Sequence, residues 1–273
     1  MSSNSAIHVG ECLTTMRRAQ PLVHNITNYV AMNVMANVLL AAGASPAMVH
    51  ACEEVGEFAA LASALTINIG TLSPTWVEAM VLAADAAGAA GKPWVLDPVA
   101  AGATRYRSRT AAQLVELRPT VIRGNASEIL ALDGASGAGR GVDATDAVAS
   151  AEAAALALAN SSGAVVAATG AVDFVTDGKR VARIANGHLL MPRVTALGCS
   201  LTGVVGAFLA SVDDPFDATV AALAYYGAAG EIAGNEARGP GDFAVRFLDA
   251  LANLGAGELD RRAKVDVTLI ARA

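Results

Sequence analysis

The stretch RVTALGCSLTGVVGAFLA, from Arg193 to Ala210, decides how this chain folds. It predicts a short strand, Val194-Thr195, and then a tight turn in which Gly198 adopts an unusual backbone angle. The run after Cys199 is uncharged and mostly apolar, which is typical of a buried helix. Because the first turn of such a helix has unpaired N–H groups, it can hold an anion. The stretch indicates either an anion-binding helix start with a reactive cysteine at its rim or a buried helix with a core cysteine.

Composition excludes several classes of protein. The 273 residues are 54% hydrophobic and carry a net charge of −6, and the sequence has no basic stripe or polybasic run. This pattern argues against binding to nucleic acid or to a membrane surface. The three cysteines (Cys12, Cys52, Cys199) lack CxxC spacing, and the four histidines are scattered. We therefore expect no disulfide framework and no zinc site, in keeping with a reducing cytoplasm.

One long segment resembles a membrane span in its lack of charge. No Asp, Glu, Lys or Arg lies between Arg18 and Glu53. Asparagines recur through it, however, and Gly43 and Pro46 interrupt it. We interpret the region from Tyr29 to Ala42 as a helix buried in the protein or at a subunit interface. The N-terminus has no signal-peptide pattern.

Short apolar strands alternate with helices along the first two thirds of the chain. This rhythm predicts an α/β fold with a mostly parallel central sheet covered by helices on both faces. The expected strands are 21–28, 44–49, 65–69, 94–97, 120–123 and 164–168, and the expected helices are 5–18, 29–42, 53–64, 73–88, 111–117, 125 onward and 143–160.

The pattern changes near residue 174. Asp177-Gly178 and Asn186-Gly187 are both hairpin signals, so we expect a short antiparallel meander at the sheet edge. The region from Asp217 to Ala273 is expected to be mostly helical, with a break at Gly239-Pro240-Gly241. Because no linker or internal repeat divides the chain, residues 1–273 are expected to form one domain.

Ligands of open α/β sheets bind at the carboxyl ends of the parallel strands. Several polar residues, and the apolar Met48, are expected at those ends, where the topology brings them together. These positions are Asn28, Met48, Asn68, Gly70, Thr71, Asp97, Arg123, Asn125, Glu128, Thr169 and the Gly198-Cys199 turn.

Asp97 and Glu128 are candidate ligands for a hydrated Mg²⁺, a cation that takes few carboxylates when nucleotide phosphates supply other ligands. Two structural alternatives stay open. Asp97 is also suited to cap or turn the chain before Pro98, and Asn125 with Glu128 matches a capping box. Arg123 ends an apolar strand, so its guanidinium requires an anionic partner, either Glu128 or a phosphate.

The glycine-rich run from Gly134 to Gly141 looks like a phosphate loop. It follows a helix rather than a strand and lacks the GK[ST] ending, so we interpret it as a flexible loop rather than a nucleotide site.

The ordered motifs PLVHNITNYV, GASPAM, NIGTLS, LDPVAAGAT, IRGNASEI, AATGAVDFV, VTALGCSLT and GPGDF run almost end to end. In these motifs the chain resembles the hydroxyethylthiazole kinases, ribokinase-like enzymes of thiamine salvage. The resemblance implies a ribokinase-like three-layer sandwich and phosphorylation of the hydroxyl of 4-methyl-5-(2-hydroxyethyl)thiazole by MgATP. It also implies a cytoplasmic homotrimer with active sites where subunits meet.

The resemblance also implies roles by position. Asn28, Met48, Gly70, Thr71 and Ala196 correspond to substrate-binding positions, Arg123 and Thr169 to ATP contacts, and Asp97 and Glu128 to organisers of Mg²⁺. Gly198 and Cys199 fall in the catalytic anion-hole loop. Many ribokinase-like enzymes have an aspartate base where this chain has Cys199, and a helix N-terminus can lower the pKa of a thiol there.

Two positions depart from the family pattern. Ala196 replaces a glycine of the usual GTGC or GAGC loop, with the bulkier Leu197 following it, and Ala100 replaces the glycine of LDPVGAGAT. If position 196 needs a left-handed backbone, alanine there costs about 1 kcal/mol. Two alternatives to thiazole phosphorylation remain. One is another ribokinase-like activity, on hydroxymethylpyrimidine or on hydrated nicotinamide nucleotides, and the other is non-catalytic binding of thiazole or nucleotide.

Overall fold

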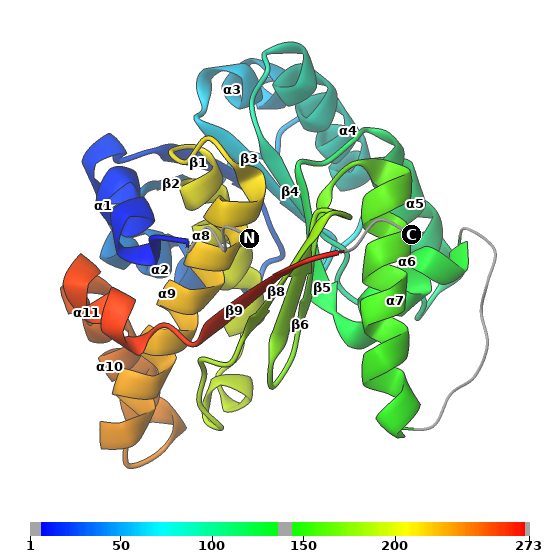
Figure 1. Ribbon diagram of the computed structural model, residues 1–273. Helices are drawn as coiled ribbons and strands as arrows, with labels where there is room; N and C mark the ends of the chain where they lie inside the picture. The colour runs from blue at the N-terminus through cyan, green and yellow to red at the C-terminus, as the bar shows by residue number, and fades with distance from the viewer. Residues whose placement is uncertain (1–6, 136–143, 271–273) are drawn as a thin grey trace.

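A nine-stranded sheet forms the centre of the protein (Figure 1). The computed structural model describes residues 7–135 and 144–270. The first six strands in the sheet order pair in parallel, and the last three add antiparallel strands at one edge. In spatial order the strands are β2 (Ser45–Ala47), β1 (Leu22–Ile26), β3 (Ala64–Asn68), β4 (Trp94–Asp97), β5 (Val121–Asn125), β6 (Val165–Thr169), β7 (Asp173–Thr176), β8 (Arg180–Ile184) and β9 (Val265–Leu269).

Helices cover both faces of the sheet, as Figure 1 shows, which confirms the expected three-layer α/β sandwich. One face carries α1 (Val9–Ala19), α2 (Met32–Ala42), α8 (Leu197–Leu209), α9 (Pro215–Glu236), α10 (Pro240–Asn253) and α11 (Ala256–Arg262). The other carries α3 (Val55–Leu61), α4 (Pro74–Ala89), α5 (Arg105–Glu116), α6 (Ala126–Ala135) and α7 (Ala144–Ser162).

The central strands are buried on both sides, so successive residues belong to two different cores. In β5, Val121 packs with the α8 side and Ile122 with the α4 side. This division follows from the two-residue period of a strand. Helix α8 lies close to the sheet because it carries glycine where the backbones approach: a Cβ at Gly206 would lie 2.7 Å from Thr66 Cγ2. The predicted buried helix is therefore confirmed.

Local signals placed several elements correctly. Ser73 caps α4, because its side chain accepts a hydrogen bond from Trp76 N, with Pro74 at the first helical position. Asp177-Gly178 turns β7 into β8, with Gly178 at φ +81°. The uncharged segment forms α2, which packs in the core cluster that contains α8. No helix in the described part of the chain is both long and apolar enough to cross a membrane.

Three expectations about secondary structure were wrong. Val194-Thr195 forms a bend and a turn rather than a strand. Gly198 lies inside α8, and the left-handed residue is instead Ala196, with φ 64°. Asn186-Gly187 does not close a hairpin, because β8 pairs with the distant β9. The region from Asp217 is mostly helical as expected, with a break between α9 and α10, and β9 is a strand near its end.

Element boundaries differ elsewhere. Helix α5 begins at Arg105, six residues before the expected position 111, with Thr104 as its N-cap. Helix α1 begins at Val9. Of the glycine-rich run, Gly134 and Ala135 close α6 and positions 136–141 lie outside the described residues.

Candidate active site

The carboxyl ends of the parallel strands gather the predicted polar residues along one edge of the sheet. A chain of hydrogen bonds crosses three of these ends. Asn28 Nδ2 donates to Asn68 Oδ1 at 3.0 Å, and Asn68 Nδ2 donates to Asp97 Oδ2 at 2.7 Å. All three side chains are buried, so the network fixes one arrangement of the site.

The same network reaches the start of α8. Asn28 Nδ2 lies 3.3 Å from Cys199 Sγ, and the Thr202 hydroxyl donates to Asp97 Oδ2 at 2.8 Å. The strand ends are thus joined to the first two turns of the helix that the sequence singled out.

Gly70 fits closely against this network. Its N–H donates to Asn68 Oδ1 at 2.9 Å, and a Cβ at this position would lie 2.7 Å from Asn28 Nδ2. Thr71 follows in the same turn.

Met48 comes after β2 and is partly buried against the core that contains α8. The next residue, Val49, is close to β1, because its carbonyl oxygen lies 2.7 Å from His24 Nε2. The structure therefore places Met48 beyond β1, at the margin of the edge.

Asp97 is the most buried acid of the site. Burial raises its pKa to about 6, nearby Glu128 adds to the rise, and Arg123 opposes it. Its Oδ2 receives the hydrogen bonds from Asn68 and Thr202, whereas Oδ1 is buried without a hydrogen-bond partner. A buried carboxylate oxygen with no donor is suited to a cation.

Glu128 closes the predicted capping box. Its Oε2 accepts from Asn125 N at 2.8 Å, and Asn125 Oδ1 accepts from Glu128 N at 3.0 Å. Its Oε1 also accepts from Ala100 N at 2.9 Å, which ties the loop after β4 to the start of α6. Capping and a metal role remain compatible, because each carboxylate oxygen retains a further lone pair.

Arg123 points to the start of α8. It donates to the Gly198 carbonyl oxygen at 3.0 Å and to Thr169 Oγ1 at 2.8 Å, and its Nη1 lies 3.6 Å from Asp97 Oδ2. The carboxylate beside it is therefore that of Asp97, and Glu128, one of the two partners considered, forms no ion pair with it. Its buried Nε has no hydrogen-bond partner.

The N-terminus of α8 has the geometry expected of an anion hole. Ala196 is the N-cap in left-handed conformation and makes no side-chain capping bond. The first N–H groups of the helix therefore have no side-chain acceptor from the cap, which leaves them available to an anion. Leu197 is buried, and its carbonyl oxygen accepts hydrogen bonds from Ser200 and Tyr226.

The surroundings of the Cys199 thiol favour its neutral form. Burial raises its pKa, Asp97 raises it further, and hydrogen bonds from Asn28 and Asn68 lower it only in part. A lowering of this pKa by the helix N-terminus stays a prediction.

A cavity of about 770 Å³ opens beside Arg123 and Thr169. Gly198 and Asn125 line its polar end, and Leu189, Met191, Pro192, Leu223 and Tyr226 are among the residues of its remaining wall. Asp173 also lines it, accepts a hydrogen bond from Gly170 N and has a pKa raised by burial to about 6. The size and the mixed lining suit a small organic anion.

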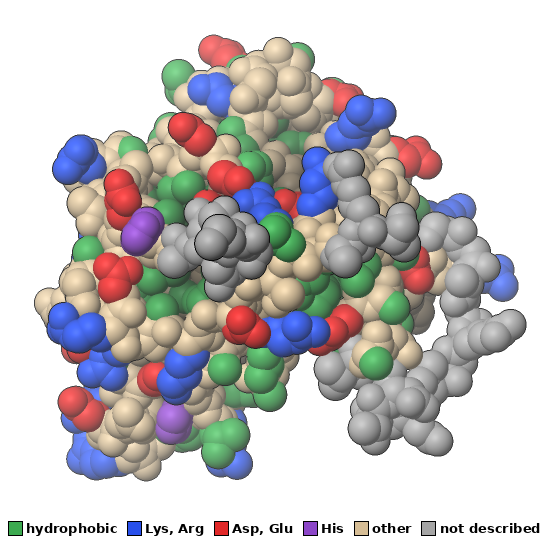
Figure 2. All heavy atoms as spheres, in the orientation of Figure 1, with side chains coloured by type: hydrophobic (Ala, Val, Ile, Leu, Met, Phe, Trp, Pro, Cys, Tyr) green, Lys and Arg blue, Asp and Glu red, His purple; other side chains and the backbone are tan. Residues whose placement is uncertain are grey.

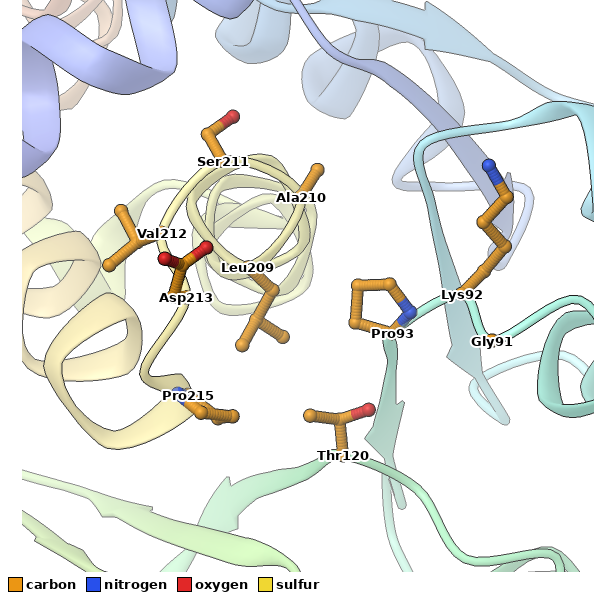
Figure 3. Close-up of a pocket in the computed structure, with 10 residues that line it drawn as sticks. All are labelled: Gly91, Lys92, Pro93, Thr120, Leu209, Ala210, Ser211, Val212, Asp213 and Pro215. Carbon is orange, nitrogen blue, oxygen red and sulfur yellow. The ribbon is translucent and has the colours of Figure 1, made fainter.

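A second hollow of about 360 Å³ lies at the opposite, amino ends of β4 and β5 (Figure 3). Ten residues line it, namely positions 91–93, 120, 209–213 and 215, and only Lys92 and Asp213 among them are charged. It contains none of the predicted site residues. The described residues also contain no group of three His, Cys, Asp or Glu that could hold a metal by themselves.

The sequence did not reveal every residue that shapes the site. Arg107 donates to the carbonyl oxygens of Ile69 (2.6 Å), Gly70 (2.9 Å) and Val99 (3.0 Å), so it links the loops that follow β3 and β4. Thr202, one turn after Cys199, holds Asp97. Neither residue has a sequence signature, because each acts on partners distant in the chain.

Figure 2 shows acidic and basic side chains interspersed over the visible face, with no single-sign patch for nucleic acid.

Comparison with known proteins gives a consistent result. The model of the hydroxyethylthiazole kinase family matches residues 13–257. Curated hydroxyethylthiazole kinases from Cereibacter sphaeroides (strain ATCC 17029) and Rhizobium johnstonii are 67% and 63% identical, each over 94% of this chain and over 98% and 96% of their own lengths.

Solved structures agree. A hydroxyethylthiazole kinase protein from Pyrococcus horikoshii OT3 superposes with a TM-score of 0.89 at 43% identity, covering 95% of this chain and 98% of its own. Pyridoxal kinase from Staphylococcus aureus, in complex with AMP-PCP and pyridoxal, has a TM-score of 0.63 at 15% identity over 92% of this chain and 100% of its own, a likeness of fold alone.

Proposed function

This chain belongs to the hydroxyethylthiazole kinase family, and from that premise we propose that it phosphorylates the hydroxyl of 4-methyl-5-(2-hydroxyethyl)thiazole with ATP. The observation that carries the proposal is the meeting of Asn28, Arg123 and the N-terminus of α8 around Cys199. In the reaction the substrate oxygen forms a bond to the γ-phosphorus, the bond to ADP breaks, and the hydroxyl proton leaves. Such transfers depend mainly on positioning and on stabilisation of charge.

The triphosphate is proposed to lie at the polar end of the 770 Å³ cavity. Arg123 and Thr169 line that end, and Arg123 has a buried Nε with no acceptor in the protein. The N–H groups at the start of α8 then receive the transferred phosphoryl group, where a helix N-terminus favours negative charge. Gly198 is proposed to keep this space free for phosphate: a Cβ there would lie in ordinary contact with the Arg123 guanidinium, at 3.5 Å.

The thiazole is proposed to lie along the strand ends next to Cys199. Asn28 offers a fixed amide, held by Asn68, and Gly70 with Thr71 lines the adjacent turn. Met48 offers polarizable apolar surface from the margin of the edge. Ala196 is proposed to meet the substrate through its backbone, which has the left-handed conformation that glycine adopts most readily.

Asp97 and Glu128 are proposed to hold Mg²⁺ together with the phosphates of ATP. The unpartnered, buried Oδ1 of Asp97 fits such a cation, and a pair of carboxylates fits a metal that keeps waters and phosphate ligands. Bound Mg²⁺ would neutralise charge on the phosphate oxygens. Asn68 and Thr202 fix the Asp97 carboxylate by occupying its other oxygen.

Cys199 is proposed to position the substrate hydroxyl rather than to act as a strong base. Burial and Asp97 raise the pKa of the thiol, which favours its neutral form, and Asn28 sets its orientation through a 3.3 Å contact. A neutral thiol is a poor proton acceptor. The enzyme therefore depends on orientation and on the anion hole for most of its rate.

We further propose a cytoplasmic homotrimer acting in thiamine salvage, with active sites at the subunit interfaces. Tyr29 and Val30, immediately after Asn28, are 66% and 62% exposed in one chain, which suits burial against a neighbouring subunit. Residues 1–273 are proposed to form one domain, because β1 and β9 belong to the same sheet.

An acceptor panel tests the activity. The purified protein, with MgATP, is offered hydroxyethylthiazole, hydroxymethylpyrimidine and pyridoxal, and the products are identified by mass. Thiazole phosphate as the dominant product supports the proposal. Preferential phosphorylation of another acceptor would favour a different ribokinase-like activity, and tight thiazole binding without any product would favour a non-catalytic binder.

A further inference from the structure

One wall of the 770 Å³ cavity is a segment of irregular backbone that packs directly on helix α9. Positions 185–189, 191 and 192 line the cavity, and Gly227 of α9 lines it beside them. The segment lacks secondary structure of its own apart from a short 3₁₀ turn, Met191–Arg193. Its position therefore depends on what holds it from outside the cavity.

Three glycines on one face of α9 receive this segment. A Cβ at Gly227 would lie 2.6 Å from the carbonyl oxygen of Asn186, and one at Gly234 would lie 2.1 Å from the ring of His188. At Gly230 a Cβ would lie 2.5 Å from Met191 Sδ. The spacing of three and four residues puts all three glycines on the same side of the helix. No larger residue fits beneath the segment as it stands.

Polar bonds fix the segment at its first turn. Asn186, only 6% exposed, donates to Glu231 Oε1 at 3.2 Å and to the Arg262 carbonyl oxygen at 2.9 Å. Gly187 N also donates to Glu231 Oε1, at 3.2 Å, and Lys264 N donates to Asn186 Oδ1 at 2.8 Å. Lys264 Nζ balances the charge of Glu231 at 2.8 Å. The segment is thus clamped between α9 and the start of β9.

We propose that the glycine face of α9, formed by Gly227, Gly230 and Gly234, is a positioning element that sets the width of the nucleoside end of the cavity. This inference rests on the proposed function, because it assumes that the phosphates of ATP lie at the opposite, Arg123 end. Gly227 is the decisive member, since a side chain there meets backbone, which must move into the cavity. At Gly230 the obstacle is the flexible end of Met191, which can turn away.

The test compares Gly227→Ala with Gly88→Ala. A Cβ at position 88, in α4, would meet no atom within 4 Å, so both variants replace a helical glycine but only one displaces the segment. We expect Gly227→Ala to raise the KM for ATP about tenfold, with the KM for thiazole and the kcat at saturating ATP unchanged. Binding of a fluorescent ATP analogue should weaken by the same factor, and Gly88→Ala should match the native chain in every reading.

A second pair of variants provides a rescue. Gly234→Ala should also raise the KM for ATP, because its methyl group displaces the His188 ring. His188→Ala removes that ring, so Gly234→Ala added to it should raise the KM no further. This pair carries the test if Gly227→Ala does not fold. A purely structural role of the glycines would instead lower thermal stability without a selective change in the KM for ATP.

The outcomes are distinguishable. A folded Gly227→Ala with native ATP affinity, or one in which the KM values for ATP and thiazole rise equally, would overturn the positioning role while leaving the kinase activity intact. A native chain that binds no ATP would instead overturn the proposed function, and the ATP-positioning role with it.

Discussion

The Asn28 side-chain amide lies 3.3 Å from Cys199 Sγ, so the end of β1 is held against the first turn of α8. The same nitrogen donates to Asn68, whose amide holds the buried Asp97. One asparagine therefore connects the residues assigned to substrate, phosphoryl transfer and metal.

Replacing Asn28 by alanine should impair use of the thiazole more than use of ATP. The substitution removes the amide that is proposed to bind the thiazole and that Asn68 and Cys199 hold in place. Because a lost hydrogen bond of about 1.4 kcal/mol corresponds to a factor of about ten, the KM for thiazole should rise about tenfold. The KM for ATP should change less than twofold. Steady-state kinetics with each substrate varied in turn measures both values, and an equal effect on the two would contradict the assignment.

Glu128→Gln should affect both folding and the requirement for Mg²⁺. An amide has a single acceptor oxygen, so either Ala100 N or Asn125 N loses its partner, at a cost of about 1–3 kcal/mol in unfolding free energy. The Mg²⁺ concentration for half-maximal activity should also rise. Glu116→Gln, at an exposed position of α5, is the matched control in urea unfolding and in Mg²⁺ titration. An unchanged Mg²⁺ dependence would limit Glu128 to its capping role.

Ala196→Gly should not destabilise the protein, although alanine is ordinarily the more stabilising residue. Ala196 has φ 64°, a left-handed conformation that costs about 1–2 kcal/mol for a residue with a Cβ. Relief of this strain offsets the extra chain entropy of glycine, about 0.4–1 kcal/mol, so the net change should lie between about zero and 1.6 kcal/mol of added stability.

Ala153→Gly, at an exposed position inside α7, is the control for Ala196→Gly. It should lose about 1 kcal/mol, because it has helical backbone and no strain to relieve. The two free energies of unfolding come from the same urea titration. A loss at position 196 as large as that at position 153 would refute the strain.

Cys199 should react slowly with iodoacetamide at neutral pH. Burial and the charge of Asp97 raise its pKa, so the thiolate fraction at pH 7 falls below that of a free thiol, and the rate should still be rising above about pH 9. The measurement needs a chain with Cys12 and Cys52 changed to serine, because both are also free. A rate that levels off below about pH 8 would mean that the helix start activates the thiol after all.

Local chemistry made several parts of the fold predictable. The capping box of Asn125 and Glu128 and the Asp177-Gly178 turn depend on residues within four positions of each other, and both are present. The strand ends were predictable because most parallel strands have a polar residue at their end or just after it. The same rule correctly predicts that Asn28, Asp97 and Arg123 lie at one edge of the sheet.

Nonlocal partners explain what the sequence did not reveal. Asn186-Gly187 resembles a hairpin turn, but Asn186 bonds instead to Arg262 and Lys264, about eighty residues later in the chain. That contact accompanies β9, whose partner β8 no short window contains. Glycine's preference for left-handed backbone pointed to Gly198, whereas the approach to α8 imposes that conformation on Ala196. Arg107 donates to backbone carbonyl oxygens. Every residue has such an oxygen, so no sequence motif marks the partners of Arg107.

The most direct test of the kinase assignment is ADP formation by the native chain and by Arg123→Met, each with MgATP and with or without hydroxyethylthiazole. We expect thiazole-dependent ADP from the native chain, one ADP for each thiazole phosphate. Arg123→Met should bind thiazole normally and turn over at least about 100-fold more slowly, since the charge at the start of α8 is lost. Absence of thiazole-dependent ADP from the native chain, or equal turnover by the variant, would contradict the assignment.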